Sequence, residues 1–284
     1  MENHAGVCRR RSRVLFCQPE ISAFYWPKTN EQNIVMADTS KLFNDKSDLY
    51  AQARPQYPDE LFTFIKTLVP NANTVWDCAT GNGQAAVGLS KVFGNVFATD
   101  ISDEQIANHL DVENVTFSVS PAEHTKFDDN MFDLINVAQA LHWFDFGKFW
   151  PEVQRVLKPG GAFITYAYLW FSVTPEIDAL VESEVKSVIA PYWVPNNQLA
   201  IDGYKDVTFP FEKLDMPNFD IKVEWNFDQM INYLHTWSAT RRCMDAQGSE
   251  FFAQARKKLK QAWGDPKDIK IATSPLIVIA GYPS

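Results

Sequence analysis

Short apolar segments alternate with helical patterns between residues 74 and 169, and this alternation constrains the fold more than any other feature of the chain. The apolar segments have the length of strands and cover residues 74–79, 95–100, 115–119, 132–138 and 162–169. Helical patterns lie between them at residues 84–93, 102–110 and 145–157. Such an alternation predicts a parallel sheet with helices on both faces. We therefore expect an α/β fold.

Local signals indicate where several of these elements begin and end. Ser102 and Gln105 have the spacing of a capping box, which predicts a helix that starts at Ser102. The sequence Lys158-Pro159-Gly160-Gly161 predicts the end of a helix followed by a turn. Pro151 lies within the helix expected over residues 145–157, so we expect this helix to kink there or to begin only at Pro151.

The regions on either side of this pattern are less regular. Residues 1–36 are rich in arginine, contain Pro19 and Pro27 and sustain no helical or strand period, which predicts a disordered arm. We expect residues 37–284 to form a single domain that begins with helices near residues 45–52 and from Pro58.

The alternation stops after residue 169 and gives way to a stretch rich in proline, tryptophan and tyrosine. We expect residues 171–219 to form a helical cap over the carboxyl edge of the sheet. Two late apolar segments, near residues 221–227 and 275–282, predict two further strands.

Composition excludes several classes of protein. The 284 residues include no run of eighteen apolar residues, which argues against a membrane-spanning protein. The formal net charge is −9, and nucleic-acid binding generally requires a basic surface, so we expect no nucleic-acid partner. The four cysteines lack the spacing of a metal site or a disulfide framework. We expect no metal, no membrane partner and a cytoplasmic location.

A glycine-containing turn follows the first expected strand. Gly81 and Gly83 lie directly before the helix that begins near Gln84, where backbone N–H groups can approach a ligand at the carboxyl edge of the sheet. Asp100 ends the second expected strand, where a carboxylate can accept hydrogen bonds from both hydroxyls of a ribose. A nicotinamide-dependent oxidoreductase would use the same two features, and with Ala86 the turn also satisfies its glycine pattern.

Further motifs favour another family. An acid precedes the glycine turn, a second acid ends the next strand, an Ala-Glu pair follows the third strand, and a Leu-Lys-Pro-Gly-Gly segment comes later. These features are Asp77, Gly81 with Gly83, Asp100, Ala122 with Glu123, and residues 157–161. In this order they resemble the class I S-adenosylmethionine-dependent methyltransferases. The resemblance implies a Rossmann-like, seven-stranded, mostly parallel sheet with a helical cap, and S-adenosylmethionine as the cofactor.

Three shorter motifs resemble a subgroup of that family. They are Tyr50-x-x-x-Arg54-Pro55-x-Tyr57-Pro58, Ala138-Gln139-Ala140-x-His142-Trp143-Phe144 and Thr236-Trp237-Ser238-Ala239. The subgroup includes trans-aconitate-type carboxyl methyltransferases that act on small molecules. The resemblance covers about residues 41–284.

The resemblance also implies which residues bind the cofactor. They are Tyr50, Arg54, Asp77, Ala79, Thr80, Gly81, Gly83, Gln84, Asp100, Ile101, Ala122, Glu123, Ala138 and Gln139. Asp77 is expected at the ammonium end, Asp100 at the ribose and Ala122 at the adenine edge. The chain departs from the family pattern twice, with Ala79 in place of the first glycine of the loop and Pro121 in place of an acid before the Ala-Glu pair.

The chemistry of methyl transfer decides which acceptor-side residues matter. A carboxylate is already an anion at neutral pH and needs no general base, whereas a phenol or an amine would profit from one. His142 follows the fourth expected strand and is the candidate catalytic residue, either as a base or as a hydrogen-bond donor, although it could equally be structural. Trp143, Trp237 and Arg241, the last next to Arg242, are the candidate substrate-binding residues, with core packing or a solvated helix face as the alternatives.

The leading hypothesis is a methyltransferase that methylates a small molecule, most plausibly at a carboxylate oxygen. The alternative is a catalytically silent module that binds the cofactor as a sensor or partner subunit, which only Ala79 and Pro121 support. The sequence does not distinguish a monomer from a homodimer.

Overall fold

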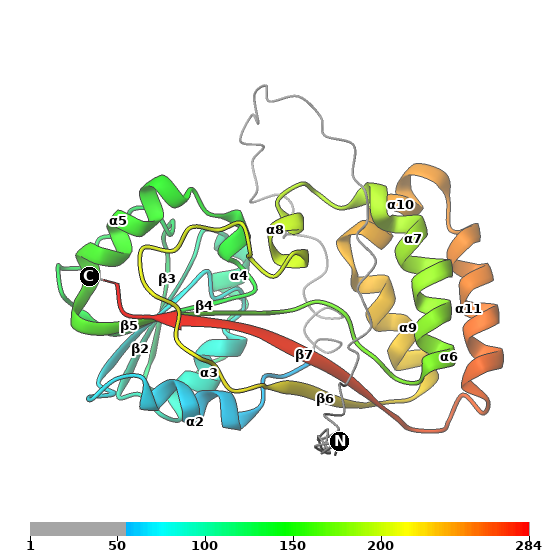
Figure 1. Ribbon diagram of the computed structural model, residues 1–284, viewed down its shortest axis with the longest axis horizontal. Coiled ribbons are helices and arrows are strands. Elements are labelled where there is room, and N and C mark those ends of the chain that lie inside the picture. The colour runs from blue at the N-terminus through cyan, green and yellow to red at the C-terminus, as the bar shows by residue number, and fades with distance from the viewer. Residues whose placement is uncertain (1–54, 284) are drawn as a thin grey trace, which may run out of the picture. The chain divides into compact units, whose positions relative to one another are not determined.

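The computed structural model describes residues 55–283 (Figure 1). Its central element is a seven-stranded sheet with the strand order β3-β2-β1-β4-β5-β7-β6. The strands are β1 (Thr74–Cys78), β2 (Asn95–Asp100), β3 (Val115–Val119), β4 (Phe132–Ala138), β5 (Leu157–Tyr168), β6 (Asp220–Trp225) and β7 (Lys270–Gly281). Strands β1 to β5 run parallel to one another, and β7 runs antiparallel to its neighbour β5. Strand β6 pairs antiparallel with β7 and therefore runs in the same direction as β1 to β5. The predicted Rossmann-like, mostly parallel sheet is confirmed.

Some predictions fall outside the described residues. They concern the arm over residues 1–36, the helix near residues 45–52, and the site residues Tyr50 and Arg54.

Helices cover both faces of the parallel strands, because β1, β4 and most of β5 are buried on both sides. On one face, α2 (Asp59–Thr67) and α3 (Gln84–Ser90) pack against β1, β2 and β4. On the other face, α5 (Phe146–Val156) packs through Phe149, Val153 and Val156. The short α4 (Asp103–Ala107) follows β2, and Ser102 caps it by accepting a hydrogen bond from the Gln105 amide, as predicted.

Helix α5 starts before Pro151, which decides between the two predicted possibilities. The helix begins at Phe146, because the Asp145 carboxylate accepts a hydrogen bond from the Gly147 amide and caps its first turn. Pro151 lies inside the helix, so the expectation that the helix begins only at Pro151 is wrong.

The Lys158-Pro159-Gly160-Gly161 segment forms an irregularity at the beginning of β5. Phe132 pairs with Leu157 and Leu134 pairs with Ala162, so β5 bulges against β4 between these pairs. A Cβ atom at Gly161 would lie 2.9 Å from the carbonyl oxygen of Asp133, which only glycine avoids. The strand therefore starts at Leu157, earlier than the expected residue 162.

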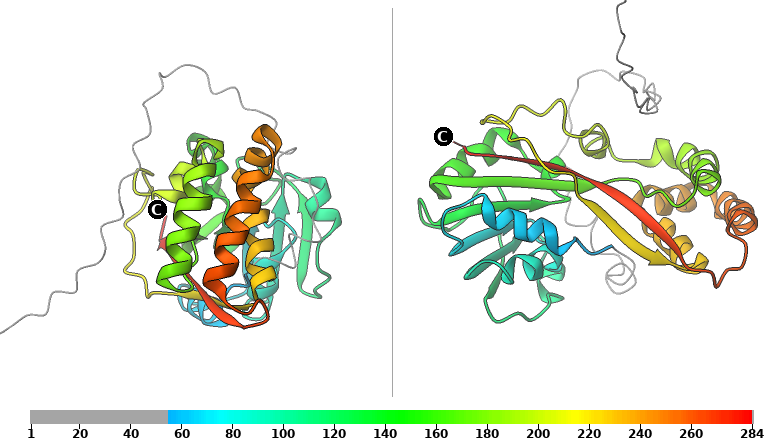
Figure 2. Two further views of the ribbon diagram at one scale, coloured as in Figure 1. Left: turned by 90° about the vertical axis from the view of Figure 1, so that its right-hand side faces the viewer. Right: turned by 60° about the horizontal axis from the view of Figure 1, so that its bottom comes forward.

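The helical cap is larger than the segment expected over residues 171–219. Its first part consists of α6 (Pro175–Leu180), the π-helix η3 (Val181–Lys186), α7 (Ser187–Ile189), the 3-10 turn η4 (Ala190–Tyr192) and α8 (Asn197–Ile201). Its second part follows β6 and consists of α9 (Phe227–Thr236), α10 (Ser238–Gln247) and α11 (Glu250–Trp263). Figure 2 shows the long helices of the two parts side by side.

Packing explains why the cap has two parts. Ile177, Val181 and Val185 form an apolar stripe on the first part, and Met230 and Leu259 of the second part lie in the same core cluster. An apolar stripe of this kind must be buried against another element. The end of the segment expected as cap instead returns to the sheet, where the Leu214 amide donates a hydrogen bond to the Ala280 carbonyl over 2.9 Å.

Strand β7 connects the cap to the sheet (Figure 1). Residues 270–275 pair with β6, and residues 276–281 pair with β5. Leu276 of β7 is opposite Tyr168, the last residue of β5. The cap therefore begins where the parallel strands end, next to their carboxyl edge.

Within residues 55–283, none of the helices combines the length and the apolar character that crossing a bilayer requires.

Candidate active site

The loop after β1 has an unusual backbone. Ala79, Gly81 and Gly83 all adopt positive φ angles, of 56°, 58° and 93°. The Thr80 amide donates to the Thr99 carbonyl of β2 over 2.8 Å, and the Gly83 amide donates to the Thr80 carbonyl over 3.0 Å. These bonds fold the loop across the carboxyl ends of β1 and β2, where open α/β sheets bind their ligands.

The two glycines are required for different reasons. A Cβ atom at Gly83 would lie 2.7 Å from the Phe117 ring, so a side chain there cannot be accommodated without a shift. Gly81 has a φ of 58°, which strains any residue with a side chain, and among the described residues a Cβ atom there would meet only the Gln105 side chain, at 3.8 Å, so within this part of the chain the backbone is open. Ala79 also adopts a left-handed conformation, which strains an alanine but would not strain a glycine.

Asp77 is fully buried beneath this loop. Its carboxylate accepts a hydrogen bond of 2.7 Å from the Asn136 side-chain amide of β4 and another from the Thr80 hydroxyl. Burial raises the pKa of Asp77 to about 6, and the two side-chain hydrogen bonds oppose this rise. Asp77 therefore fastens the loop to β4 and places a negative charge beneath it, without contacting the open side.

Asp100 lies at the end of β2 and is partly buried. One carboxylate oxygen accepts a hydrogen bond from the Gly81 amide over 2.9 Å, and the other accepts one from the Ser102 amide over the same distance. Burial raises the pKa of Asp100, and these bonds oppose the rise. The adjacent Ile101 side chain is 52% exposed, which is unusual for an apolar residue beside a polar loop.

The Ala-Glu segment after β3 has mixed roles. Ala122 is buried in the core cluster that includes Trp76 and Val137. The Glu123 carboxylate accepts a hydrogen bond of 3.0 Å from the Asp145 amide. Glu123 thus holds the segment that leads into α5.

Two glutamines among the predicted cofactor residues bind backbone carbonyls. Gln139 follows β4, has a φ of 57°, and donates from its side-chain amide to the Tyr168 carbonyl of β5 over 2.8 Å. Gln84 donates in the same way to the Pro55 carbonyl over 2.7 Å. Gln139 joins the carboxyl ends of β4 and β5, next to Ala138, and Gln84 holds the segment before α2 against the start of α3.

His142 is buried in a 3-10 turn, η2 (Leu141–Trp143), that follows β4. Its Nδ1 atom lies 3.2 Å from the Tyr204 hydroxyl, and its carbonyl accepts a hydrogen bond of 3.0 Å from the Asn196 side-chain amide. Burial lowers the pKa of His142 to about 4, so the imidazole is neutral at physiological pH. The Trp143 ring centroid lies 5.0 Å from that of His142.

The remaining predicted substrate residues belong to the cap. Trp237 is largely buried, with its ring centroid 5.2 Å from that of Trp170. Arg241 and Arg242 lie on α10 and are partly buried, and Arg242 donates from Nη1 to the Tyr192 carbonyl over 3.0 Å.

The structure thus brings the loop residues, Asp100 and the end of β4 together at one edge of the sheet. Sequence reasoning did not single out Asn136, which pairs directly with Asp77 across β1 and β4. A polar residue in the middle of an otherwise apolar strand was the available signal. It also missed Asn196 and Tyr204, which are the hydrogen-bond partners of His142. The sequence carries no comparable signal for either residue.

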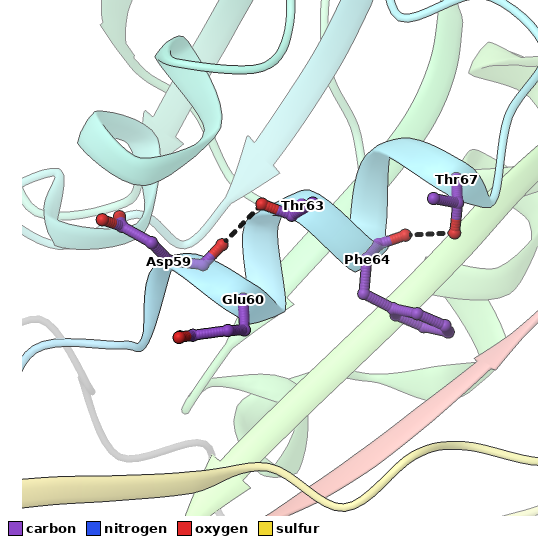
Figure 3. Close-up of a pocket in the computed structure, with 5 residues that line it drawn as sticks. All are labelled: Asp59, Glu60, Thr63, Phe64 and Thr67. Carbon is purple, nitrogen blue, oxygen red and sulfur yellow. Dashed lines mark hydrogen bonds between the residues drawn. The ribbon is translucent and has the colours of Figure 1, made fainter.

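Two other features of the described residues are not candidate sites. A shallow pocket beside α2 is lined by Asp59, Glu60, Thr63, Phe64 and Thr67 (Figure 3). All five residues lie on this one helix, and both threonine hydroxyls bond to its own backbone. In the same part of the chain, no cluster of three or more histidine, cysteine or acidic residues is placed to hold a metal ion.

Comparisons with known proteins agree with this geometry. The family model of a methyltransferase domain matches residues 76–165. A "putative methyltransferase" of Dictyostelium discoideum is 30% identical over 245 residues, which cover 82% of this chain and 93% of the relative. The chain belongs to the class I S-adenosylmethionine-dependent methyltransferases.

Two further matches show how far the similarity extends. A solved "putative type II methyltransferase" from Anaeromyxobacter dehalogenans has a TM-score of 0.77 and 36% identity, and the match covers 81% of this chain and 97% of that one. A ubiquinone/menaquinone biosynthesis C-methyltransferase of Rickettsia felis is 33% identical over 138 residues, which cover 38% of this chain and 56% of the relative. The chain is therefore an S-adenosylmethionine-dependent methyltransferase and not a nicotinamide enzyme.

The residues at the edge of the sheet fit this cofactor. The Gly81 backbone is open, Asp100 lies beside it at the end of β2, and the exposed Ile101 side chain offers an apolar surface for a flat base. Asp77 adds negative charge beneath the loop, which favours a ligand that carries a sulfonium and an ammonium group.

Proposed function

We propose that this methyltransferase methylates a small organic acid at a carboxylate oxygen. The observation that carries the proposal is the state of His142, the candidate base nearest the end of β4. Its ring is buried, its Nδ1 atom contacts Tyr204, and its pKa is lowered to about 4. A residue with such a pKa is a weak base at neutral pH. An acceptor that is already an anion needs no base.

The residues of the chain contribute positioning and charge to the transfer. The cofactor supplies an electrophilic methyl group on a sulfonium. The loop between Ala79 and Gly83, held by Asp77 and Thr80, orients the backbone that faces the cofactor. We assign to Asp100 the role of accepting hydrogen bonds from the ribose, and its position beside the Gly81 amide at the end of β2 supports this role. Positioning of this kind supplies most of the acceleration in an in-line displacement, because no proton has to move.

We assign the acceptor side to residues of two elements. His142 and Trp143 belong to the turn after β4, and Trp237 and Arg241 belong to the cap, at the start of α10 and within it. We assign to His142 the role of holding the acceptor side in place through its bonds to Asn196 and Tyr204. The trans-aconitate-type motifs support a carboxylic acid as the acceptor.

The proposal also concerns partners and location. A net charge of −9 supports a small-molecule acceptor over nucleic acid. The same composition and the scattered cysteines support a cytoplasmic location without a membrane partner.

The test uses S-adenosylmethionine with a tritium-labelled methyl group and a panel of small carboxylic acids. Methyl esters release labelled methanol in mild base, whereas methyl groups on nitrogen, carbon or a phenol oxygen stay attached. We expect base-labile label that requires both enzyme and acid. Label that resists base, or that forms only with phenols, amines or a carbon acceptor such as a quinone precursor, would overturn the carboxylate proposal.

A further inference from the structure

Arg242 is partly buried in the cap, and among residues 55–283 it has no acidic partner. Its Nη1 atom donates to the Tyr192 carbonyl over 3.0 Å, and no carboxylate in the part of the chain that the structure describes forms an ion pair with it. Burial and the neighbouring charge of Arg241 lower the pKa of Arg242. A buried cation is costly unless an anion or several acceptors compensate it. The remaining N–H donors of its guanidinium are therefore available to an anionic ligand.

The segment whose backbone Arg242 binds carries aromatic rings. Tyr192 is followed by Trp193, whose ring centroid lies 6.0 Å from that of Trp170, and Trp170 also packs edge to face with Trp237. Trp170 and Trp193 are only partly buried, so part of each ring is available for contact. Flat apolar molecules bind well to such rings.

A lysine at the end of a π-helix lies over the Trp170 ring. Lys186 lies with its ammonium nitrogen 4.3 Å from the centre of the Trp170 ring, and it ends the π-helix η3. π-helical segments within helices occur frequently at functional sites. Here the segment ends with the residue whose ammonium group lies over Trp170.

Two connections join this group to the carboxyl edge of the sheet. Trp170 lies just beyond β5, whose last carbonyl, that of Tyr168, binds the Gln139 side chain at the end of β4. Tyr192 is four residues before Asn196, which binds the His142 carbonyl. Four residues span at most roughly 14 Å, so Arg242 lies within the reach of a small molecule from the turn after β4.

We propose that Arg242 binds the carboxylate of the methyl acceptor while Trp170 and Trp193 contact a flat apolar body attached to it. This inference rests on the proposed function. One guanidinium N–H bonds to one carboxylate oxygen, and a lone pair of the other oxygen attacks the methyl carbon. The new O–C bond forms as the C–S bond breaks, the electron pair stays on sulfur, and no proton is transferred. A guanidinium together with partly exposed tryptophan rings suits a carboxylic acid that carries a flat apolar group, and this is the class of acceptor that we propose.

The test measures binding of benzoate, trans-cinnamate and neutral benzamide in the presence of S-adenosylhomocysteine. Quenching of tryptophan fluorescence and isothermal calorimetry report binding. We expect the two acids to bind the wild type at least tenfold more tightly than benzamide. Arg242→Gln removes this preference, Arg242→Lys restores part of it, and none of the variants changes the affinity for S-adenosylhomocysteine, which also shows that they fold.

The matched control is Arg256→Gln, because Arg256 is an exposed arginine of α11 that is paired with Asp228 over 2.8 Å. It should bind the acids as the wild type does. The inference is overturned if neither acid binds the wild type, or if Arg242→Gln binds both acids unchanged. Methyl esters formed by Arg242→Gln with an unchanged KM would refute the inference and leave the proposed function intact. If the acids bind through Arg242 but no methyl ester forms, the proposed carboxylate methylation is refuted, whereas Arg242 still binds the acids.

Discussion

Ala79 shows how a single side chain tunes the loop after β1. It has a φ of 56°, a conformation that costs an alanine about 1 kcal/mol and costs glycine almost nothing. We expect Ala79→Gly to raise the free energy of unfolding in urea by about 0.5–1 kcal/mol. Ala253→Gly, at an exposed position inside α11, should lower it by about 1 kcal/mol. Equal losses in both variants would contradict the strain at Ala79.

Asp77 links stability to pH. Its pKa is raised from an ordinary value of 3.8 to about 6, so the folded state binds the proton more tightly than the unfolded state. Asp77 therefore lowers the stability of the ligand-free protein as pH rises from about 4 to about 7, by about 3 kcal/mol. We expect Asp77→Asn to match the wild type near pH 4 and to be more stable near pH 7.5 in urea unfolding.

The same substitution should weaken binding of S-adenosylmethionine, because it removes the negative charge beneath the loop. Calorimetry at pH 7.5 measures this loss. If Asp77→Asn is no more stable than the wild type at pH 7.5, the ionised Asp77 carboxylate does not destabilise the folded state.

At this scale the sequence predicted the positions of the loop glycines and Asp100 because turn residues and strand ends carry local signals. It did not predict that both carboxylate oxygens of Asp77 would be occupied. That arrangement depends on the register that places Asn136 opposite Asp77, and register is a property of two strands.

At the scale of elements, the turn η2 and the cap segment that contains α8 are joined through His142. Asn196 and Tyr204 both come from that segment and bind the carbonyl and the ring of His142. His142 therefore acts as an anchor between two elements. Burial lowers the pKa of His142 from 6.5 to about 4, so between these pH values the unfolded chain binds a proton that the folded ring does not, and His142 lowers the stability of the fold as pH falls from about 6.5 to about 4.

This role predicts the behaviour of His142→Gln, which keeps a hydrogen-bonding side chain. We expect kcat to fall by less than about tenfold, compared with the 10²–10⁴ that removal of a general base costs. The pH profile of the wild type should show no inflection from His142 between pH 5.5 and 8. A loss above a hundredfold, together with an inflection that disappears in the variant, would identify His142 as the base instead.

The elements themselves were predictable to different degrees. Strands β1 to β4 follow short apolar runs between turns, so the sequence places them closely, whereas β5 begins at Leu157, before the expected residue 162. The cap could not be delimited in this way, because its stability depends on α6 and η3 packing against α11 far along the chain. Likewise, nothing local indicates that β7 changes its partner from β6 to β5 after Pro275.

At the scale of the whole molecule, charge acts differently on the two ligands. The net charge of −9 attracts the cationic cofactor and repels an anionic acceptor, and both effects weaken with added salt. A site for an organic acid on such a protein needs a local cation, and Arg242 of the cap is the residue that we propose for this role.

The central claim is that the loop after β1 and the carboxylate of Asp100 bind S-adenosylmethionine. Calorimetric titration with S-adenosylhomocysteine tests it most directly, with Asp100→Ala and the control Asp103→Ala, whose side chain is exposed on α4. We predict one binding site in the wild type and in Asp103→Ala, and at least a tenfold weaker affinity in Asp100→Ala. No detectable binding to the wild type, or equal affinity in Asp100→Ala, would contradict the claim.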